Sequence, residues 1–267
     1  MSQQPEDILT ESIDQYKPVK IFALFSGGHD SLSITHWASQ QPGFSGVFHV
    51  NTRIGIEESN EFVRNTCRKY GWPLFEATPP ELQYEDIVLR FGFPGPAAHR
   101  YTYVWLKERA LNAFIQTQKV KRSDKILLIT GVRRQESIRR MGTTQEVSKS
   151  GAKIWVAPFI DKSKVEVNDY LNNHNLPRNE VVDLIHKSGE CLCGAYARQG
   201  ELDELAVWFP KKAHYLRQLE NRVKSAGFPW GWEDEPPAWF QQWQKGQMFM
   251  PGMQSLFMPM CHDCLKV

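Results

Sequence analysis

The feature that most constrains the fold is an alternation of short apolar runs with segments of helical periodicity. Four runs rich in β-branched and aromatic residues fit buried strands, at residues 19–25, 46–52, 125–132 and 153–160. Segments with helical spacing lie between them, at residues 30–40, 57–70 and 104–118. Strands that alternate with helices favour a mainly parallel sheet with helices on both faces. We therefore expect a doubly wound α/β fold.

The alternation ends near residue 175. Beyond it come a loop-like stretch, a close pair of cysteines and a helical segment at residues 201–225. Residues 227–254 are dense in Trp, Pro and Met without a clear period, so we expect irregular structure packed on the core. Residues 78–99 are expected to form a long loop. These features predict an N-terminal extension (residues 1–18), an α/β domain (residues 19–175) and a smaller helical and irregular region that carries cysteines (residues 176–267).

Charge and hydropathy exclude some classes of protein. The formal net charge of +2 neither requires nor excludes nucleic acid as a partner. The first residues are polar and acidic, unlike a secretory signal, and no apolar run approaches the roughly 20 residues of a membrane span. We therefore expect a cytoplasmic protein without a membrane segment. In that compartment clustered cysteines more often hold metal than form disulfides.

The first predicted strand ends in the glycine turn SGGHDS, residues 26–31, ahead of a predicted helix. Two adjacent glycines let the backbone approach an anion closely, and the start of the following helix favours negative charge. Ser26 and Ser31 add hydroxyl donors, and Asp30 is placed to cap the helix or to help hold a cation. A plain strand-to-helix turn with polar caps is the alternative interpretation. The turn lacks the Gly-Lys-Ser/Thr ending of a Walker loop, so an ATPase that cleaves the γ-phosphate is not indicated.

The pattern Ser-Gly-Gly-x-Asp-Ser after a first strand resembles the PP-loop of the adenine nucleotide α-hydrolase superfamily. Three further stretches resemble one branch of it, the phosphoadenosine phosphosulfate (PAPS) reductase family, at residues 49–63, 130–140 and 165–183. The resemblance runs from about residue 19 to 210. It implies that residues 19–175 form a nucleotide-binding domain that grips the pyrophosphate of ATP for cleavage between the α and β phosphates.

The resemblance also implies a set of site residues. Ser26, Asp30 and Arg133 are expected to take part in catalysis. Arg53 stands where glycine is usual in the family. The residues expected to contact the nucleotide are Ser26, Gly27, Gly28, Asp30, Ser31, Asn51, Thr52, Gly131, Arg133, Arg134, Ser137 and Arg140.

The arginines at residues 133, 134, 139 and 140 follow a predicted strand that ends in Thr130-Gly131. Arginine forms paired, planar hydrogen bonds with phosphate or sulfate oxygens, which lysine does not match. A solvated charged face is the alternative interpretation of such a run. Because the cluster lies at the predicted carboxyl end of its strand, we interpret it as an anion site, with Arg133 and Arg140 on the family motif.

Two close cysteine pairs, Cys191-Leu-Cys193 and Cys261-His-Asp-Cys264, stand roughly seventy residues apart. Four thiolates in this arrangement suit Zn²⁺ or a [4Fe-4S] cluster equally well on ligand count. The resemblance favours the cluster, because relatives in this family hold one with a close pair in mid-chain and a Cys-x-x-Cys further on. The first pair here is Cys-x-Cys instead of their adjacent Cys-Cys. Cys67 lies on the apolar side of a predicted helix and is expected to be a buried small hydrophobe.

Three functions remain open at this stage. The first is an ATP pyrophosphatase that uses ATP and Mg²⁺ to adenylate an acceptor, with a [4Fe-4S] cluster serving sulfur incorporation such as nucleic-acid phosphorothioation or thiolation. The second is a sulfonucleotide reductase acting on a sulfated adenylate. Such reductases use a cysteine in a C-terminal Glu-Cys-Gly-Leu-His segment, which this sequence does not contain. The third is a nucleotide-binding accessory protein of a defence or mobile-element system.

The expected partners follow from these functions. They are an adenine nucleotide, a sulfur donor such as a cysteine desulfurase, and a second copy of the chain in a homo-oligomer. Basic segments at residues 118–125 and 209–224, together with the late tryptophans, suit a nucleic acid. A solvated helix face and core packing are the alternative explanation of those features.

Overall fold

The computed structural model describes residues 3–80, 82–96, 99–136 and 144–237. These residues divide into two compact units whose segments interleave along the chain. Unit 1 takes its residues from 1–50, 57–77 and 111–189, and unit 2 takes its residues from 51–56, 78–110 and 190–267. Among the helices of these described ranges, none is both long and apolar enough to cross a membrane.

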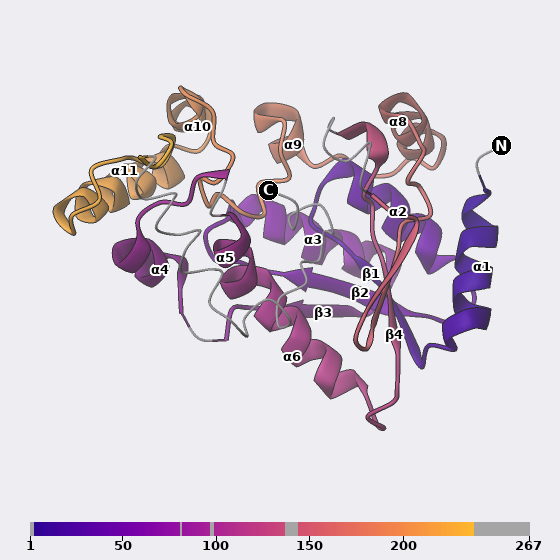
Figure 1. Ribbon diagram of the computed structural model, residues 1–267. Coiled ribbons are helices and arrows are strands. Elements are labelled where there is room, and N and C mark those ends of the chain that lie inside the picture. Colours follow the sequence, from indigo (N-terminus) through magenta and orange to yellow (C-terminus); the bar gives the residue numbers. More distant parts are fainter. Residues whose placement is uncertain (1–2, 81, 97–98, 137–143, 238–267) are drawn as a thin grey trace. The chain divides into compact units, whose positions relative to one another are not determined.

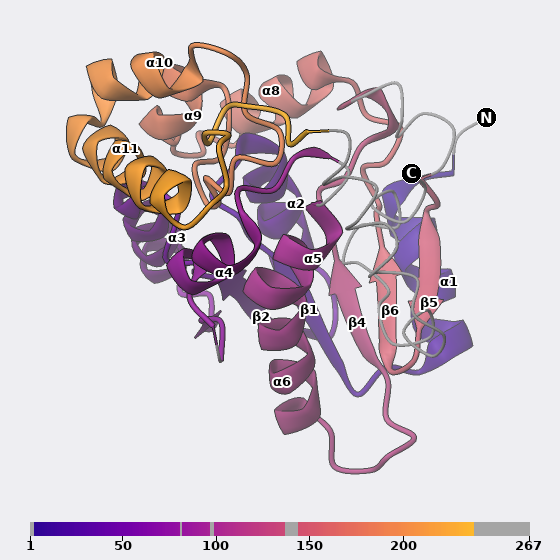
Figure 2. The same cartoon turned by 60° about the vertical axis from the view of Figure 1, so that its left-hand side comes forward.

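Unit 1 is built around a six-stranded sheet in the order β3-β2-β1-β4-β6-β5. All neighbouring strands run parallel except β5, which is antiparallel to β6. In Figure 2, β4, β6 and β5 lie side by side. The strands are β1 (Lys20–Leu24), β2 (Phe44–Val50), β3 (Leu74–Ala77), β4 (Ile126–Ile129), β5 (Val147–Ser150) and β6 (Lys153–Val156).

Helices cover both faces of this sheet (Figure 1). Those of unit 1 are α1 (Pro5–Tyr16), α2 (His29–Ser39), α3 (Glu57–Tyr70), most of α6 (Arg109–Gln118), the 3-10 helix η3 (Arg134–Glu136), α8 (Lys164–Asn173) and α9 (Glu180–Ile185). The expected doubly wound, mainly parallel α/β fold is confirmed.

Successive side chains of a strand point to opposite faces of the sheet, and this alternation explains how both faces are packed against helices. Ile21 and Ala23 of β1 are buried in one cluster with residues of α1 and α2. Phe22, between them, contacts the ring of Phe114 of α6 with ring centroids 4.9 Å apart. Phe48 of β2 stacks on the same ring at 4.4 Å. β1 therefore buries side chains on both sides of the sheet. The carboxyl ends of β1 and β4 meet at one edge of the sheet, because these neighbouring strands are parallel.

Unit 2 contains the helices that follow or interrupt this pattern. They are α4 (Tyr84–Phe91), α5 (His99–Tyr103), the π-helical turn η2 (Val104–Glu108), α10 (Glu201–Trp208) and α11 (Pro210–Ser225). The long loop expected at residues 78–99 is therefore wrong in part, because α4 forms there with a capping box between Gln83 and Asp86. The single helix expected at residues 201–225 is divided, since Pro210 begins a new helix.

Two of the late tryptophans form the interior of unit 2. Trp230 and Trp232 are 4% and 1% exposed. Their indole N–H groups donate to the backbone oxygens of Phe93 and Leu192, at 2.9 and 2.8 Å. The expectation of irregular structure packed on the core is confirmed for these two residues. For these two tryptophans the alternative of core packing holds, because both rings are buried.

Candidate functional site

The glycine turn joins β1 to α2 in unit 1 and is held by its own serines. The Ser31 hydroxyl donates to the Gly28 carbonyl oxygen at 2.8 Å and accepts from the Ser26 amide at 3.3 Å. Gly27 has φ +81°, the left-handed region that glycine adopts without strain. Gly28 is the N-cap of α2 and offers no side-chain cap to the amides of the first turn. This is the local geometry of an anion-binding turn at a helix N-terminus.

Asp30 and Arg133 form the charged centre of this turn. Arg133 follows β4, and its Nη2 donates to Asp30 Oδ2 at 2.9 Å. Arg133 is only 4% exposed, and its Nε has no hydrogen-bond partner. Lys164, on α8, approaches Asp30 Oδ1 at 3.4 Å. The structure thus brings together Ser26, Asp30, Ser31 and Arg133, and leaves a buried guanidinium N–H available to a further acceptor.

The close approach of the end of β4 to the first turn of α2 explains why residue 131 is a glycine. A Cβ at this position would lie 2.8 Å from the backbone oxygen of Asp30, closer than real side-chain contacts. Glycine is therefore required for β4 to end against the first turn of α2. Because Gly131 has no side chain, β4 ends close enough to α2 for Arg133 to contact Asp30.

Asn179 is a functional candidate that the list of expected site residues does not include. Its Nδ2 donates to the Gly27 carbonyl oxygen at 2.8 Å, while its Oδ1 accepts from Val181 as the N-cap of α9. The side chain is 2% exposed. The signal in the sequence is an Asn ahead of a helix, in the Leu-Pro-x-Asn stretch at residues 176–179. Asn179 holds the backbone of the turn in place from α9.

His29 is the buried side chain inside the glycine turn. It is 3% exposed, and its Nε2 has no hydrogen-bond partner. Arg178 Nη2 lies 3.4 Å from His29 Nδ1 and pairs with Asp183 at 2.8 Å. Burial, and next the charge of Arg178, lower the pKa of His29. Both effects favour the neutral form of the ring.

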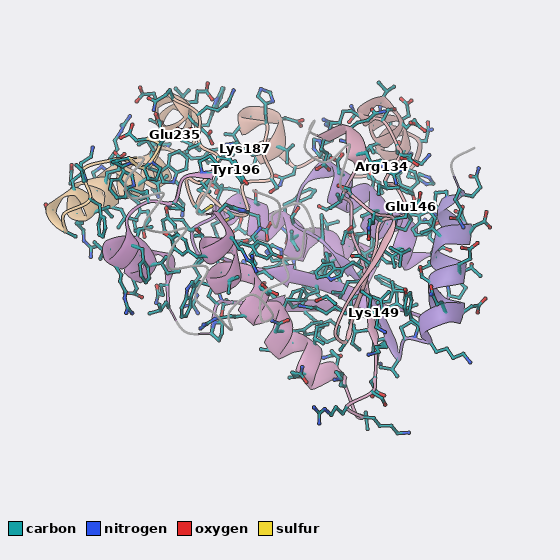
Figure 3. The ribbon with its side chains drawn as sticks, viewed as in Figure 1. Arg134, Glu146, Lys149, Lys187, Tyr196 and Glu235 are labelled. Atoms are coloured by element: carbon teal, nitrogen blue, oxygen red, sulfur yellow. The ribbon has the colours of Figure 1, made fainter. Side chains whose placement is uncertain are left out.

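Arg134 is engaged elsewhere in unit 1. Its guanidinium pairs with Asp161, and with Glu146 at 3.6 Å. Figure 3 shows Arg134 beside Glu146 at one end of β5 and Lys149 toward the other end. Arg134 also lines a polar cavity of about 440 Å³ with residues of α1 and of the segment before β5. The structure therefore does not bring Arg134 to Asp30. Ser137 and Arg140 lie outside the described residues.

Asn51 and Thr52 belong to unit 2. The Asn51 side chain accepts from the Arg53 amide at 2.9 Å. Arg53 has φ +63°, in the left-handed region that favours glycine, which fits the position where the family usually has one. The Thr52 hydroxyl is buried and donates to the Glu190 carbonyl oxygen at 2.7 Å. Thr52 therefore supports the cysteine segment that starts next to Glu190.

The pair Cys191 and Cys193 lies in a segment fixed on several sides within unit 2. Tyr84 donates to the Cys193 carbonyl oxygen at 2.9 Å. Lys107 donates to Glu190 at 3.0 Å. The hydrogen bond between the two thiols raises the pKa of Cys191 and lowers that of Cys193. Burial alone would lower the pKa of Lys107, but the charges of Glu190 and Cys191 outweigh it and raise the pKa.

Two thiols within hydrogen-bonding distance, beside the part-buried ammonium of Lys107, suit one side of a thiolate-ligated metal centre. No cluster of three or more His, Cys, Asp or Glu side chains able to bind a metal occurs within the part of the chain that the structure describes. Cys261 and Cys264 lie outside that part. Cys67 is buried on α3, as expected, and burial raises its pKa to about 12. This thiol is therefore inert.

The parallel sheet, with a glycine turn and a buried arginine at the carboxyl ends of β1 and β4, defines a doubly wound α/β protein whose donor groups at this edge suit an anionic ligand. The sequence model of the phosphoadenosine phosphosulfate reductase domain matches residues 20–191, which is more than half of the chain. The chain belongs to this family of the PP-loop superfamily.

Solved structures with similar folds share little sequence with this chain. A phosphoadenylyl-sulfate (PAPS) reductase from Candida auris, in a phosphate complex, has a TM-score of 0.52 and 16% identity, covering 68% of this chain and 85% of its own. An FMN adenylyltransferase from Candida glabrata, with FMN and an ATP analogue, has a TM-score of 0.48 and 14% identity, and the match covers 67% of this chain and 58% of that protein. The U34-tRNA thiolase NcsA from Methanococcus maripaludis, with its [4Fe-4S] cluster, has a TM-score of 0.38 and 13% identity, and the match covers 82% of this chain and 80% of that protein. No curated protein matches the chain.

Proposed function

We propose that this protein is an ATP pyrophosphatase of the PAPS reductase family that activates an acceptor for sulfur incorporation. An acceptor oxygen attacks the α phosphorus of ATP and forms a new P–O bond. The bond between the α phosphorus and the bridging oxygen breaks, and pyrophosphate leaves. The acceptor loses its proton to solvent and becomes adenylated. Later displacement of AMP by a sulfur nucleophile completes the incorporation.

The observation that carries this proposal is the Asp30–Arg133 pair at the glycine turn. A buried arginine with an unpartnered N–H lies next to backbone amides at a helix start, so the site is rich in donors and positive charge. Donors of this kind stabilise the charge that develops on a leaving pyrophosphate. Ser26, Gly27, Gly28 and Ser31 would bind its oxygens through backbone and hydroxyl groups.

Mg²⁺ fits the same turn through Asp30. The Asp30 carboxylate is the oxygen ligand that this ion prefers, and Lys164, a half-exposed side chain at 3.4 Å, is the partner it would displace. When bound, Mg²⁺ would neutralise phosphate charge. Arg133 would stay in place, because its second contact with the Lys162 carbonyl oxygen, at 3.3 Å, fixes the guanidinium independently of Asp30.

The cysteine content of unit 1 favours ATP over a sulfated adenylate as substrate. Reduction of a sulfated adenylate requires a thiolate to attack sulfur. The only cysteine within the described residues of unit 1 is Cys67, which is buried and has its pKa raised to about 12. Cleavage of ATP at the α phosphorus requires no thiol.

The cysteine pair of unit 2 is assigned to a metal centre within this proposal. Cys191 and Cys193, with Cys261 and Cys264, would hold a [4Fe-4S] cluster, with Zn²⁺ as the alternative. The cluster would hold or pass sulfur supplied by a donor such as a cysteine desulfurase. The acceptor class proposed is a nucleic acid, modified by phosphorothioation or thiolation.

The test uses protein purified without oxygen, with iron, zinc and the visible spectrum measured first. One sample receives ATP and Mg²⁺ with a mixture of DNA and tRNA, and a second receives PAPS with reduced thioredoxin. The proposal predicts pyrophosphate from the first sample and no sulfite from the second. Sulfite without pyrophosphate would establish the reductase instead. Neither product, together with zinc in place of iron, would indicate an accessory nucleotide-binding protein and overturn the proposal.

A further inference from the structure

Lys164 is a lysine at a position where a helix disfavours positive charge. It is the first residue of α8, directly after the N-cap Ser163, whose hydroxyl accepts from the Glu166 amide at 3.2 Å. The start of a helix carries partial positive charge, so an acidic side chain is favoured there and a lysine is not. A residue that breaks a local rule of this kind is a candidate for a function beyond its own helix.

The side chain of Lys164 extends from α8 to the glycine turn. Helix α8 packs against α2 within unit 1 (Figure 1). The Lys164 ammonium lies 3.4 Å from Asp30 Oδ1, and Asp30 is the only carboxylate that pairs with it among the residues the structure describes. Asp30 is the second residue of α2. The ammonium of Lys164 therefore lies close to the helix start at which an anion would bind.

The contact with Asp30 is one that Lys164 can leave at small cost. The Lys164 side chain is 53% exposed, and its ion pair with Asp30 is a single contact. Exposed ion pairs of lysine contribute little to stability. Asp30 is also bound at its other oxygen by the buried Arg133, at 2.9 Å. Asp30 thus keeps a partner when Lys164 moves away.

Arg178, a second half-exposed cation near the turn, is held more firmly. It lies 3.4 Å from His29 Nδ1 and binds Asp183 through two nitrogens, Nε at 3.2 Å and Nη2 at 2.8 Å. Paired hydrogen bonds of this kind fix the plane of a guanidinium. The turn itself, residues 26–31, contains no lysine or arginine. Of the two half-exposed cations, Lys164 is therefore the one able to exchange partners.

From this arrangement we propose that Lys164 is a further phosphate-binding residue of the site, which pairs with Asp30 and moves to a phosphate oxygen of the bound nucleotide. An ammonium has three N–H donors and no fixed plane, so rotation of the side chain is enough to change its acceptor. With Mg²⁺ held at Asp30, Lys164 would be repelled from that carboxylate, and a phosphate at the turn offers it another acceptor. This role rests on the proposed function, because it assumes that a polyphosphate binds at the turn.

Three substitutions separate this contact from a general effect of charge. Lys164→Met removes the ammonium and keeps a flexible chain, whereas Lys164→Arg keeps a charged donor. Lys149→Met is the matched control, because it removes the same charge from an exposed lysine of unit 1. Lys149 pairs with Ile154 near the start of β6, whereas the turn lies at the carboxyl ends of the parallel strands. Thermal unfolding of each variant establishes that it folds.

The first readout is the ¹³C NMR spectrum of protein whose lysines carry ¹³C-methyl groups added by reductive methylation, which keeps their positive charge. The signal missing from Lys164→Arg belongs to Lys164, and the signal missing from Lys149→Met belongs to Lys149. Inorganic pyrophosphate with Mg²⁺ should shift the Lys164 signal and leave the Lys149 signal in place. A Lys164 signal that stays in place while calorimetry shows pyrophosphate binding would overturn the proposal.

The second readout is the calorimetric Kd for inorganic pyrophosphate with Mg²⁺. Lys164→Met should bind about threefold to tenfold more weakly than wild type, the loss expected for one partly exposed charged contact. Lys164→Arg should stay within about twofold of wild type, because a single charged donor is retained. Lys149→Met should bind as wild type does. Unchanged affinity in folded Lys164→Met would overturn the role of Lys164, and so would an equal loss in Lys149→Met.

The same measurements separate this inference from the proposed function. Pyrophosphate binding that is weakened in Lys164→Met, in a protein that does not cleave ATP, would support the role of Lys164 and count against the proposed function alone. Pyrophosphate binding that is equal in Lys164→Met and wild type, in a protein that cleaves ATP, would overturn the role of Lys164 alone. Wild-type protein that binds no pyrophosphate would overturn both.

Discussion

At the scale of single residues, adjacent arginines have different surroundings. Arg133 is buried and donates to Asp30, whereas Arg134 is part-exposed and pairs with Asp161 and Glu146. The sequence pattern alone treats them alike, because both follow the same strand in an arginine-rich run. What separates them is which carboxylate each guanidinium meets, and that depends on how the chain folds over long range.

This difference gives a matched pair of substitutions. Arg133→Lys should weaken ATP binding by about 1.5 to 3 kcal/mol, because lysine cannot keep the planar contacts with Asp30 and the Lys162 carbonyl while offering a further N–H. Arg134→Lys should change ATP binding by less than about 0.5 kcal/mol. Equilibrium binding of a non-hydrolysable ATP analogue measures both. Equal losses in the two variants would be evidence against the assignment of Arg133.

The cysteines allow a similar comparison. Cys193→Ser should reduce bound metal to well under half of the wild-type content, because oxygen is a poorer ligand than a thiolate for zinc or an iron-sulfur cluster. Cys67→Ala should leave the metal content unchanged, because Cys67 is a buried hydrophobe on α3. Metal analysis after anaerobic purification measures both. Full metal content in Cys193→Ser would remove this cysteine from the ligand set.

At the scale of elements, α9 supports the turn through one side chain. Asn179 caps α9 with its oxygen and holds Gly27 with its nitrogen. Asn179→Ser keeps a cap but loses the donor to Gly27, whereas Asn179→Ala loses both. We expect the serine variant to lose about 1 kcal/mol of unfolding free energy and the alanine variant about 2 kcal/mol.

Urea unfolding measures these two values, and pyrophosphate binding shows whether the turn is affected. Both variants should bind pyrophosphate more weakly, since both release the Gly27 carbonyl. Normal binding in both would show that α9 does not position the turn.

The strands show how far periodicity predicts this fold. The four apolar runs are confirmed as β1, β2, β4 and β6, which occupy the interior of the sheet. The edge strands β3 and β5 were not predicted. They are four residues each and only part-buried, with the sequences LFEA and VSKS, so they lack the long apolar run of a central strand. Edge strands of this kind are identified only in the structure, from their pairing with β2 and β6.

At the scale of the whole molecule, the interleaving of the two units was beyond what periodicity could show. Residues 51–56 belong with residues 190–237 because Thr52 bonds the carbonyl of Glu190, a contact across more than a hundred positions. Asn51 and Thr52 therefore match a nucleotide motif in sequence, while Thr52 supports the cysteine segment in the structure. Local patterns identify elements and motifs, but contacts of this length decide what each residue does.

Stability of the whole protein should depend on pH through two histidines of unit 1, His29 and His36. Burial lowers the pKa of both His29 and His36 below the ordinary value of 6.5. In the unfolded chain these rings take up protons as pH falls through about 6.5, while the folded protein resists doing so. The free energy of unfolding should therefore decrease as the pH falls from about 7 to about 5. Replacing His36 with Gln should flatten this slope, and chemical unfolding across the range measures it. A slope unchanged by the substitution would contradict the role of His36.

The most direct test of the central claim identifies which phosphate bond of ATP is broken. Protein purified without oxygen is incubated with ATP, Mg²⁺ and the nucleic-acid mixture, and the products are followed by ³¹P NMR, with Asp30→Asn as the inactive control. Cleavage at the α phosphorus predicts equal amounts of pyrophosphate and an adenylate product, both absent from the control. The appearance of ADP and inorganic phosphate, or of pyrophosphate at the same rate in the control, would contradict the account.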